Sequence, residues 1–187
     1  MYIKEKKVSQ DKQFLIWYQV LQKFFILIFI SSALVSCLGS NANSYLGYGT
    51  SGFIKSYDAA KIRLRHLDLI NAVRHERNMK GLSYSKELNA SASTHALDIS
   101  NQKRAWNFGS DYSSPQERAE LSGFVGMIMG ENVSETFEGE FSVLQVWLKN
   151  NLSSKIILDP RATHIGLGWF QEENGTLWWV QDIGRSN

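Results

Sequence analysis

Apolar residues recur at helical spacing in the first half of the folded part of this chain. Between residues 57 and 80 they fall on one face of a predicted helix, and Gly81 is the predicted stop. A second helix is predicted to follow Ser85, which would cap its first turn. The positions on the two apolar faces are Leu64, Leu67, Ile70 and Val73 in the first helix, and Leu88, Ala92, His95, Ala96 and Ile99 in the second.

The second half mixes helical and strand-like patterns. Ser114, Pro115 and Glu117 form a capping box that starts a short helix. An extended segment is predicted at 125–133, a helix around Trp147, and two strands at 164–170 and 177–183, joined by a turn containing Asn174-Gly175. Gly166 and Gly168 would share one strand face. Helices first and a hairpin last predict an α+β layered domain.

The N-terminal segment has the layout of a secretory signal. The apolar run 24–35 follows lysines and would rise only about 18 Å as a helix, too little for a hydrocarbon core of about 30 Å. It ends in Leu34-Val35-Ser36-Cys37, which resembles the lipobox of bacterial lipoproteins. We therefore predict a signal peptide at 1–36, lipidation of Cys37, a Gly/Ser/Asn-rich tether at 37–56 and one domain at 57–187. The alternatives are a buried core cysteine and an uncleaved anchor helix.

Charge and cysteine content narrow the class of protein. The formal charge is +2, but residues 1–36 contribute +3, so the remainder carries −1. A near-neutral body lacks the clustered basic surface of nucleic-acid binders, and no nucleic-acid partner is expected. The single cysteine allows no internal disulfide, so the domain must be stabilised by packing alone.

Four segments in order resemble the bacterial, SCP-like branch of the CAP superfamily. They are Leu69–Arg74, His95–Asp98, Gly130–Val133, and Trp147 leading through Ile156–Arg161 to Ile165–Gly168. The resemblance implies an α-β-α sandwich with a central antiparallel sheet and a cleft on one side. In that family the cleft usually holds two histidines with one or two glutamates, and some members bind a divalent cation there.

Carried over residue by residue, the resemblance gives four candidate cleft residues. Glu131 matches the family glutamate, Asn107 and Ser153 fall where the two histidines are expected, and His164 stands where many relatives have a glutamate. Amide and hydroxyl groups are poor substitutes for imidazole as ligands of a transition metal, so we predict no metal, no cofactor and no catalytic residue.

Each titratable residue also has a purely structural interpretation. Glu131 would be a buried carboxylate bonded to nearby backbone amides, and His95 would pack among alanines. His66 and His75 lie among Arg63, Arg65, Arg74 and Arg77, which favours a solvated helix face.

These patterns favour a membrane-tethered, non-catalytic binding or structural module in a bacterial cell envelope, held by its lipid anchor on the extracytoplasmic side. Its partner would be a lipid, an envelope component or a protein. The alternative is a hydrolase that uses Glu131 with water or a weakly bound divalent ion, and a third possibility is a structural relic that binds nothing. Sites rather than scaffolds decide activity, so the fold alone cannot choose between them.

Overall fold

A computed structural model describes residues 53–136 and 138–187. The elements in chain order are η1 (Ser56–Asp58), α3 (Ala59–His75), β1 (Ser83–Tyr84), α4 (Lys86–Gln102), α5 (Pro115–Leu121), β2 (Gly126–Thr136), α6 (Glu140–Lys149), α7 (Asn151–Ile157), β3 (His164–Gln171) and β4 (Leu177–Ser186). Helices dominate the first half and the hairpin closes the chain, which confirms the predicted α+β class.

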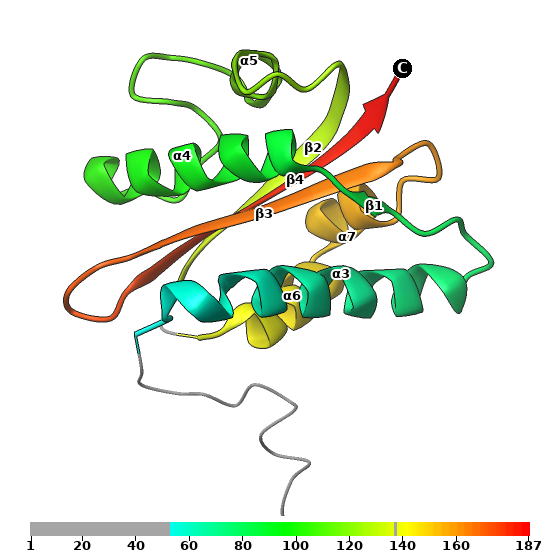
Figure 1. The fold of residues 1–187 in the computed structure, drawn as a ribbon, viewed down its shortest axis with the longest axis horizontal. Helices are drawn as coiled ribbons and strands as arrows, with labels where there is room; N and C mark the ends of the chain where they lie inside the picture. The colour runs from blue at the N-terminus through cyan, green and yellow to red at the C-terminus, as the bar shows by residue number, and fades with distance from the viewer. Residues whose placement is uncertain (1–52, 137) are drawn as a thin grey trace, which may run out of the picture. The chain divides into compact units, whose positions relative to one another are not determined.

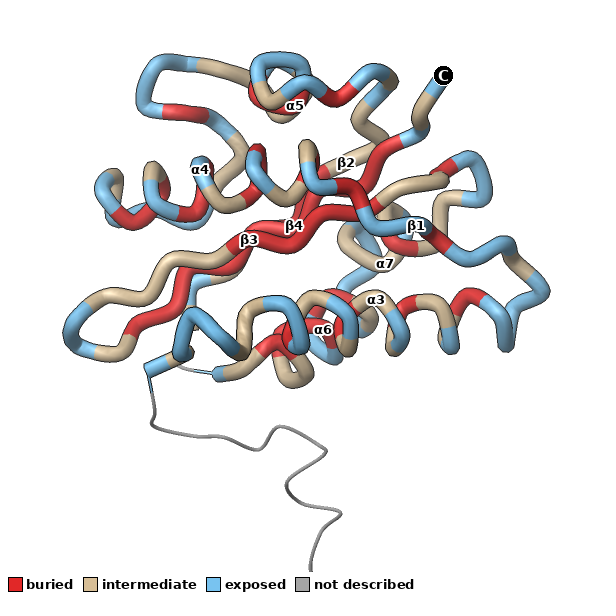
Figure 2. The backbone as a smooth tube through the Cα atoms, in the orientation of Figure 1, coloured by how far each residue is buried: buried red, intermediate tan, exposed pale blue. Residues whose placement is uncertain are grey.

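The sheet has the order β1-β3-β4-β2. Helices α4 and α5 lie on one face, while α3, α6 and α7 lie on the other, so the domain is an α-β-α sandwich (Figure 1). Strands β2 and β3 run antiparallel to β4, as expected, but the two-residue β1 pairs in parallel with β3, which makes the sheet mixed. The central strands are buried and the outward helix faces are exposed (Figure 2).

Two predicted helix starts are confirmed and one predicted stop is wrong. The Ser85 hydroxyl accepts a hydrogen bond from Leu88 N at 3.1 Å, and Ser114 with Glu117 forms the full capping box. Helix α3, however, ends at His75, well before Gly81. The chain leaves the helix earlier because Asn78 adopts the left-handed conformation (φ 57°), which asparagine tolerates better than most residues.

Helix α4 packs on β3 through two glycines. A Cβ at Gly166 would lie 2.2 Å from the Leu88 carbonyl carbon, and one at Gly168 would lie 2.2 Å from Ser93 N. The predicted flat patch is therefore filled by the α4 backbone, which approaches the sheet more closely than any larger residue would allow.

Two α3 residues expected on a solvated face are buried instead. Arg74 is 0% exposed and donates to the backbone oxygens of Lys80 (2.8 Å), Ile157 (2.7 Å) and Asp159 (3.1 Å). His66 is 1% exposed and lies edge-on to Trp147 with ring centroids 6.2 Å apart. Their partners come from distant parts of the sequence, so the local arginine-rich pattern was misleading. His75 is exposed, as expected.

The register of β2 against β4 places two unlike residue pairs side by side. Glu131 lies opposite Asp182, and Asn132 lies opposite Gln181. Neighbouring residues point to opposite faces of a strand, so the acidic pair faces α4 and α5 and the amide pair faces α3. A bulge between Ile128 and Gly130 shifts the register just before these pairs.

Candidate functional site

The centre of the candidate site is a buried ion pair between Arg118 of α5 and Glu131 of β2. Arg118 Nη2 lies 2.9 Å from Glu131 Oε1 and 2.8 Å from Oε2. The side chains are 8% and 0% exposed. The capping box fixes the first turn of α5, which aims Arg118 at the sheet. Since a guanidinium is always charged, the carboxylate is neutralised in place.

Asn107, in the loop between α4 and α5, completes the shell around Glu131. Its Nδ2 donates to the Glu131 backbone oxygen and to Oε1, at 3.0 Å in both cases. The Asn107 backbone oxygen in turn accepts from Arg118 Nη2 at 3.2 Å. The structure thus brings two of the four candidate residues into contact, with the amide acting as a donor to the carboxylate.

His95 of α4 adjoins this cluster as a neutral ring. Its Nε2 lies 2.9 Å from the Trp106 backbone oxygen and 3.6 Å from Glu131 Oε1. The carbonyl can only accept, which assigns the proton to Nε2. Burial lowers the pKa of His95 and the Arg118 cation lowers it further, while the Glu131 carboxylate opposes both effects. The predicted packing role among alanines therefore misses a polar contact.

Asp182 is the member of the cluster that the sequence pattern did not single out. It is 0% exposed, and neither of its oxygens has a hydrogen bond of regular geometry to a described residue, although Ser91 and Glu131 adjoin it. Burial and then the Glu131 carboxylate raise the pKa of Asp182 well above its usual value. Arg118 therefore pairs with Glu131, and the raised pKa of Asp182 favours the protonated form of its carboxyl group.

Ser153 belongs to the opposite layer. It lies in the first turn of α7, where its backbone N donates to the Asn150 cap at 3.1 Å. Its backbone oxygen is 3.4 Å from Asn132 Nδ2, on the face of β2 that points away from Glu131. On that face Gln181 bridges Asn132 Nδ2 (2.9 Å) and His66 Nε2 (2.7 Å).

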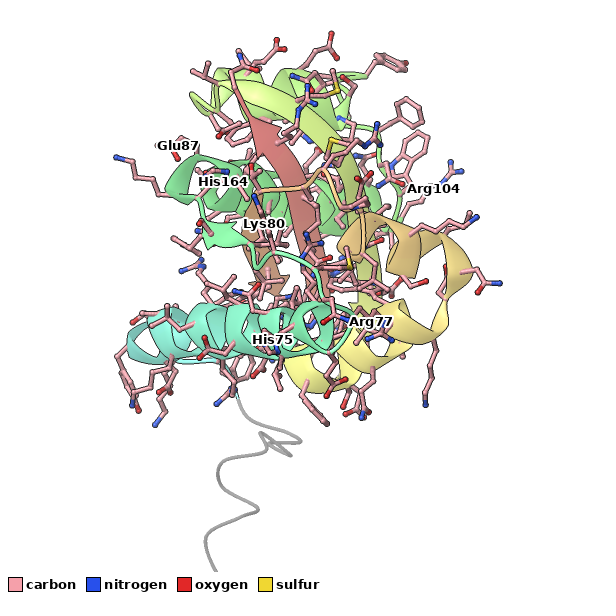
Figure 3. The ribbon with its side chains drawn as sticks, turned by 90° about the vertical axis from the view of Figure 1, so that its right-hand side faces the viewer. His75, Arg77, Lys80, Glu87, Arg104 and His164 are labelled. Carbon is pink, nitrogen blue, oxygen red and sulfur yellow. The ribbon has the colours of Figure 1, made fainter. Side chains whose placement is uncertain are left out.

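His164, at the start of β3, also stands apart from Glu131. Its Nδ1 is 2.8 Å from the Thr163 hydroxyl, and its ring lies edge-on to Phe124 with centroids 6.1 Å apart. Figure 3 shows it near Glu87, whose pKa it helps to lower after the hydrogen bonds of the first α4 turn. His164 therefore does not supply the second ligand that a metal site at Glu131 would need.

The cluster does not fit a metal ion or an acid-base pair open to substrate. No group of three or more His, Cys, Asp or Glu side chains in the described ranges is arranged to hold a metal. Both lone-pair directions of Glu131 Oε1 are already used by Arg118 and Asn107, and a desolvated guanidinium repels an incoming cation. The arrangement instead links α5 and the α4–α5 loop to the edge of the sheet.

Two findings concern the predicted anchor. Cys37, the predicted lipidation site, lies outside the described residues. Within residues 53–136 and 138–187, no helix combines the length and the apolarity that crossing a bilayer demands.

Comparison with known proteins places the fold in a family. The model of the cysteine-rich secretory protein family, CAP, matches residues 67–183. That match covers more than half of the chain, so the protein belongs to the CAP family. A curated relative is the uncharacterized protein YkwD of Bacillus subtilis, 29% identical over 119 residues. The match covers 64% of this chain and 46% of YkwD, so this chain spans about half the length of that relative.

Solved structures agree on the fold. An extracellular SCP-domain protein of Bacillus anthracis superposes with a TM-score of 0.63 at 18% identity, covering 73% of this chain and 45% of that one. An outer surface protein of Borrelia burgdorferi gives a TM-score of 0.61 at 14% identity, covering 74% of this chain and 99% of that one. These identities support the shared fold and leave function to be argued from the site.

Proposed function

We propose that this protein is a lipid-anchored, extracytoplasmic binding module whose Glu131 cluster stabilises the CAP domain and performs no catalysis. The observation that supports it is the Arg118–Glu131 pair, closed by Asn107. A general base needs a lone pair that the substrate can reach. Glu131 is instead buried against a fixed cation.

The same geometry argues against the hydrolase alternative with a weakly held divalent ion. Hard cations take six or more oxygen ligands, usually including several carboxylates or waters. Here Asp182 shares the cluster but is buried, with a raised pKa that disfavours the carboxylate form, and Arg118 occupies the side of Glu131 that an ion would approach. The remaining neighbours, Asn107 and His95, direct their N–H groups toward acceptors within the protein.

The location is supported by the relatives and by the N-terminal sequence. Similar structures include one named as an extracellular protein and one named as an outer surface protein. The apolar run 24–35 followed by Cys37 predicts export with lipidation. Several acyl chains would hold the protein stably, because each buried methylene contributes about 0.8 kcal/mol.

Metal analysis tests the cluster directly. The full chain, incubated with zinc or manganese and then desalted, is expected to retain no stoichiometric metal. The Glu131→Gln variant should give the same result. One equivalent of metal that is bound by the wild type and lost in the variant would contradict the proposal.

A double variant separates binding from hydrolysis. Glu131→Gln with Arg118→Met removes both charges together, which avoids leaving one of them buried and unpaired. Mass spectrometry of material co-purifying with each protein is expected to find the same intact ligand. Fragments bound to the wild type and intact ligand bound only to the double variant would identify a hydrolase.

Fractionation tests the anchor. Cys37→Ala protein is expected to leave the membrane fraction, and wild-type protein should carry the mass of its acyl chains on Cys37. Ser36→Ala serves as the matched control and should remain in the membrane. Retention of Cys37→Ala protein in the membrane would contradict lipid anchoring.

A further inference from the structure

Exposed apolar side chains gather where the described chain begins. Phe53 is 61% exposed, Tyr57 67% and Leu64 56%. Tyr57, Lys61 and Leu64 follow one another at helical i, i+4 and i+7 positions, so they lie on one outward face. With exposed Lys55, whose Nζ lies 5.6 Å from the centre of the Tyr57 ring, these five residues form what we call the α3 stripe.

The stripe is held to the domain rather than being part of the tether. Ile54 N donates to Gln171 Oε1 at 2.8 Å, which joins the start of the segment to the end of β3. Ile62 is buried in the core between the sheet and α3, and Ile54 packs against that core. Docking would therefore cost little ordering entropy, because the surface is already formed.

The chemistry of the stripe matches the interface of a bilayer. Tyrosine is amphipathic and favours the headgroup level, while phenylalanine and leucine can enter the acyl boundary. Lys55 and Lys61 can keep their ammonium groups among anionic headgroups while their stems cover apolar surface. Asp58 is half-buried and Asp68 begins the next exposed turn, so acidic residues bound the stripe.

We propose that the α3 stripe docks on the surface of an anionic phospholipid bilayer, beside the acyl chains on Cys37; this rests on the lipid anchor proposed above. The predicted tether leaves only residues 38–52 between the anchor and the stripe. A coil of that length has a root-mean-square reach of about 21 Å. The stripe is thus confined close to the bilayer, and a weak partitioning step becomes populated by effective concentration.

A second exposed apolar group lies around α5 and offers a competing orientation. Leu121 is 83% exposed, Val125 71% and Met127 52%. Helix α5 lies on the other side of the sheet from α3 (Figure 1). No predicted tether leads into this group, so we expect it to point away from the membrane.

Fluorescent probes at two positions test the orientation. Full-length protein is first checked by mass for acylation, which leaves an introduced thiol as the reactive one. Ser56→Cys and Glu120→Cys are labelled with nitrobenzoxadiazole and reconstituted in vesicles of phosphatidylglycerol and phosphatidylcholine. We expect a blue shift and quenching by nitroxide lipids at position 56, with neither at position 120.

Charge reversal tests the headgroup contact. Lys55→Glu with Lys61→Glu should lower the docked-to-free ratio at least about 25-fold, because each basic residue near an anionic surface contributes about fivefold. Lys86→Glu with Lys155→Glu changes the charge equally at exposed positions elsewhere and should dock as the wild type does.

The outcomes separate this proposal from the anchor. Acylated protein whose position-56 probe stays in water, or whose position-120 probe is quenched instead, overturns docking through α3 and leaves the anchor intact. Unmodified Cys37 in the mass spectrum overturns the anchor and this docking mode together.

Discussion

The two faces of the sheet solve the same problem, buried polar groups, in different ways. Toward α5, Glu131 is paired with Arg118, and the Asp182 carboxyl lies buried beside Glu131. Toward α3, Asn132 and Gln181 are neutral amides that hydrogen bond to each other, and Gln181 also reaches His66. The pairs are adjacent in the β2–β4 ladder. The comparison shows that one step along a strand separates a network that needs a counter-ion from one that needs only hydrogen bonds.

His66 on the α3 face and Asp182 on the α5 face have pKa values shifted in opposite directions. Burial lowers the pKa of His66 to about 3, so its ring stays neutral in the folded domain and takes up a proton on unfolding below about pH 6.5. Burial and Glu131 raise the pKa of Asp182, so the folded domain keeps a proton that the unfolded chain releases above about pH 4. Acid therefore weakens the α3 face through His66 and the α4–α5 face through His95, while base weakens the α4–α5 face through Asp182.

The largest loss of stability is expected on removing the Arg118 cation from the face of the sheet that carries Glu131 and Asp182. Arg118→Met leaves Glu131 buried without a counter-ion, which should lower the free energy of unfolding by about 3–5 kcal/mol in urea titrations. Arg161→Met is the control, because that guanidinium is paired with Asp159 at 64% exposure and should contribute less than about 1 kcal/mol. Equal small losses would mean that the Arg118 cluster is hydrated.

The next largest loss of stability is expected in acid, through His66 on the α3 face of the sheet. Since the folded pKa of His66 is about 3, its contribution to stability is complete above pH 6.5 and should fall by about 2.5 kcal/mol at pH 4.5. Urea titrations at both pH values measure the loss, and the slope should diminish in His66→Phe. A ring resonance of His66 that titrates above pH 5 in NMR spectra would refute this assignment.

Breaking the hydrogen bonds among Asn132, Gln181 and His66 should lower stability less than breaking the Arg118–Glu131 pair. Gln181→Leu removes the partner of His66 Nε2 and leaves Asn132 Nδ2 with only its longer contact to the Ser153 backbone oxygen, for an expected loss of about 2 kcal/mol. Gln145→Leu on the exposed face of α6 is the matched substitution and should change stability little. A loss as large as that of Arg118→Met would erase the distinction between the two faces.

The smallest effect near pH 4 is expected for Asp182→Asn. The variant keeps the shape but has no proton to release, so its stability should lie within about 1 kcal/mol of the wild type near pH 4. As pH rises, the wild type loses stability relative to the variant, because only its unfolded chain gains by ionising. Parallel stability curves from pH 4 to pH 8 would show that Asp182 is ionised in the fold.

Local signals in the sequence predicted the fold well. The Ser114 capping box and the Ser85 cap need only neighbours within four residues, and Asn174-Gly175 specifies its own turn, with Gly175 at φ 93°. Gly166 and Gly168 share a face by simple alternation. The caps and the turn are satisfied by neighbouring backbone, and the glycine face is filled by the α4 backbone, so tertiary context did not override any of these signals.

The site depended on contacts that local patterns cannot encode. Arg118 and Glu131 are on different elements, and the partner of His66 is 115 residues away. Spacing from the family pattern placed Asn107 beside Glu131 but put Ser153 on the other face. One signal was available and was missed: Asp182 follows Gln181 within a strand whose other residues from 177 to 183 are apolar, and a buried acid there must find a partner or a proton.

The extra residue in β2, at the bulge, determines which face of the sheet each later β2 side chain points to. Before the bulge, Ile128 pairs with Gly184; after it, Gly130 pairs with Ile183. Had the ladder run on uninterrupted, every later side chain would change sides, and Glu131 would stand opposite Gln181 in the compartment of His66. Gly130 would then stand opposite Asp182, and the guanidinium of Arg118 would lose its carboxylate partner. The bulge therefore determines that the Glu131 side chain lies on the face of the sheet where Arg118 can pair with it.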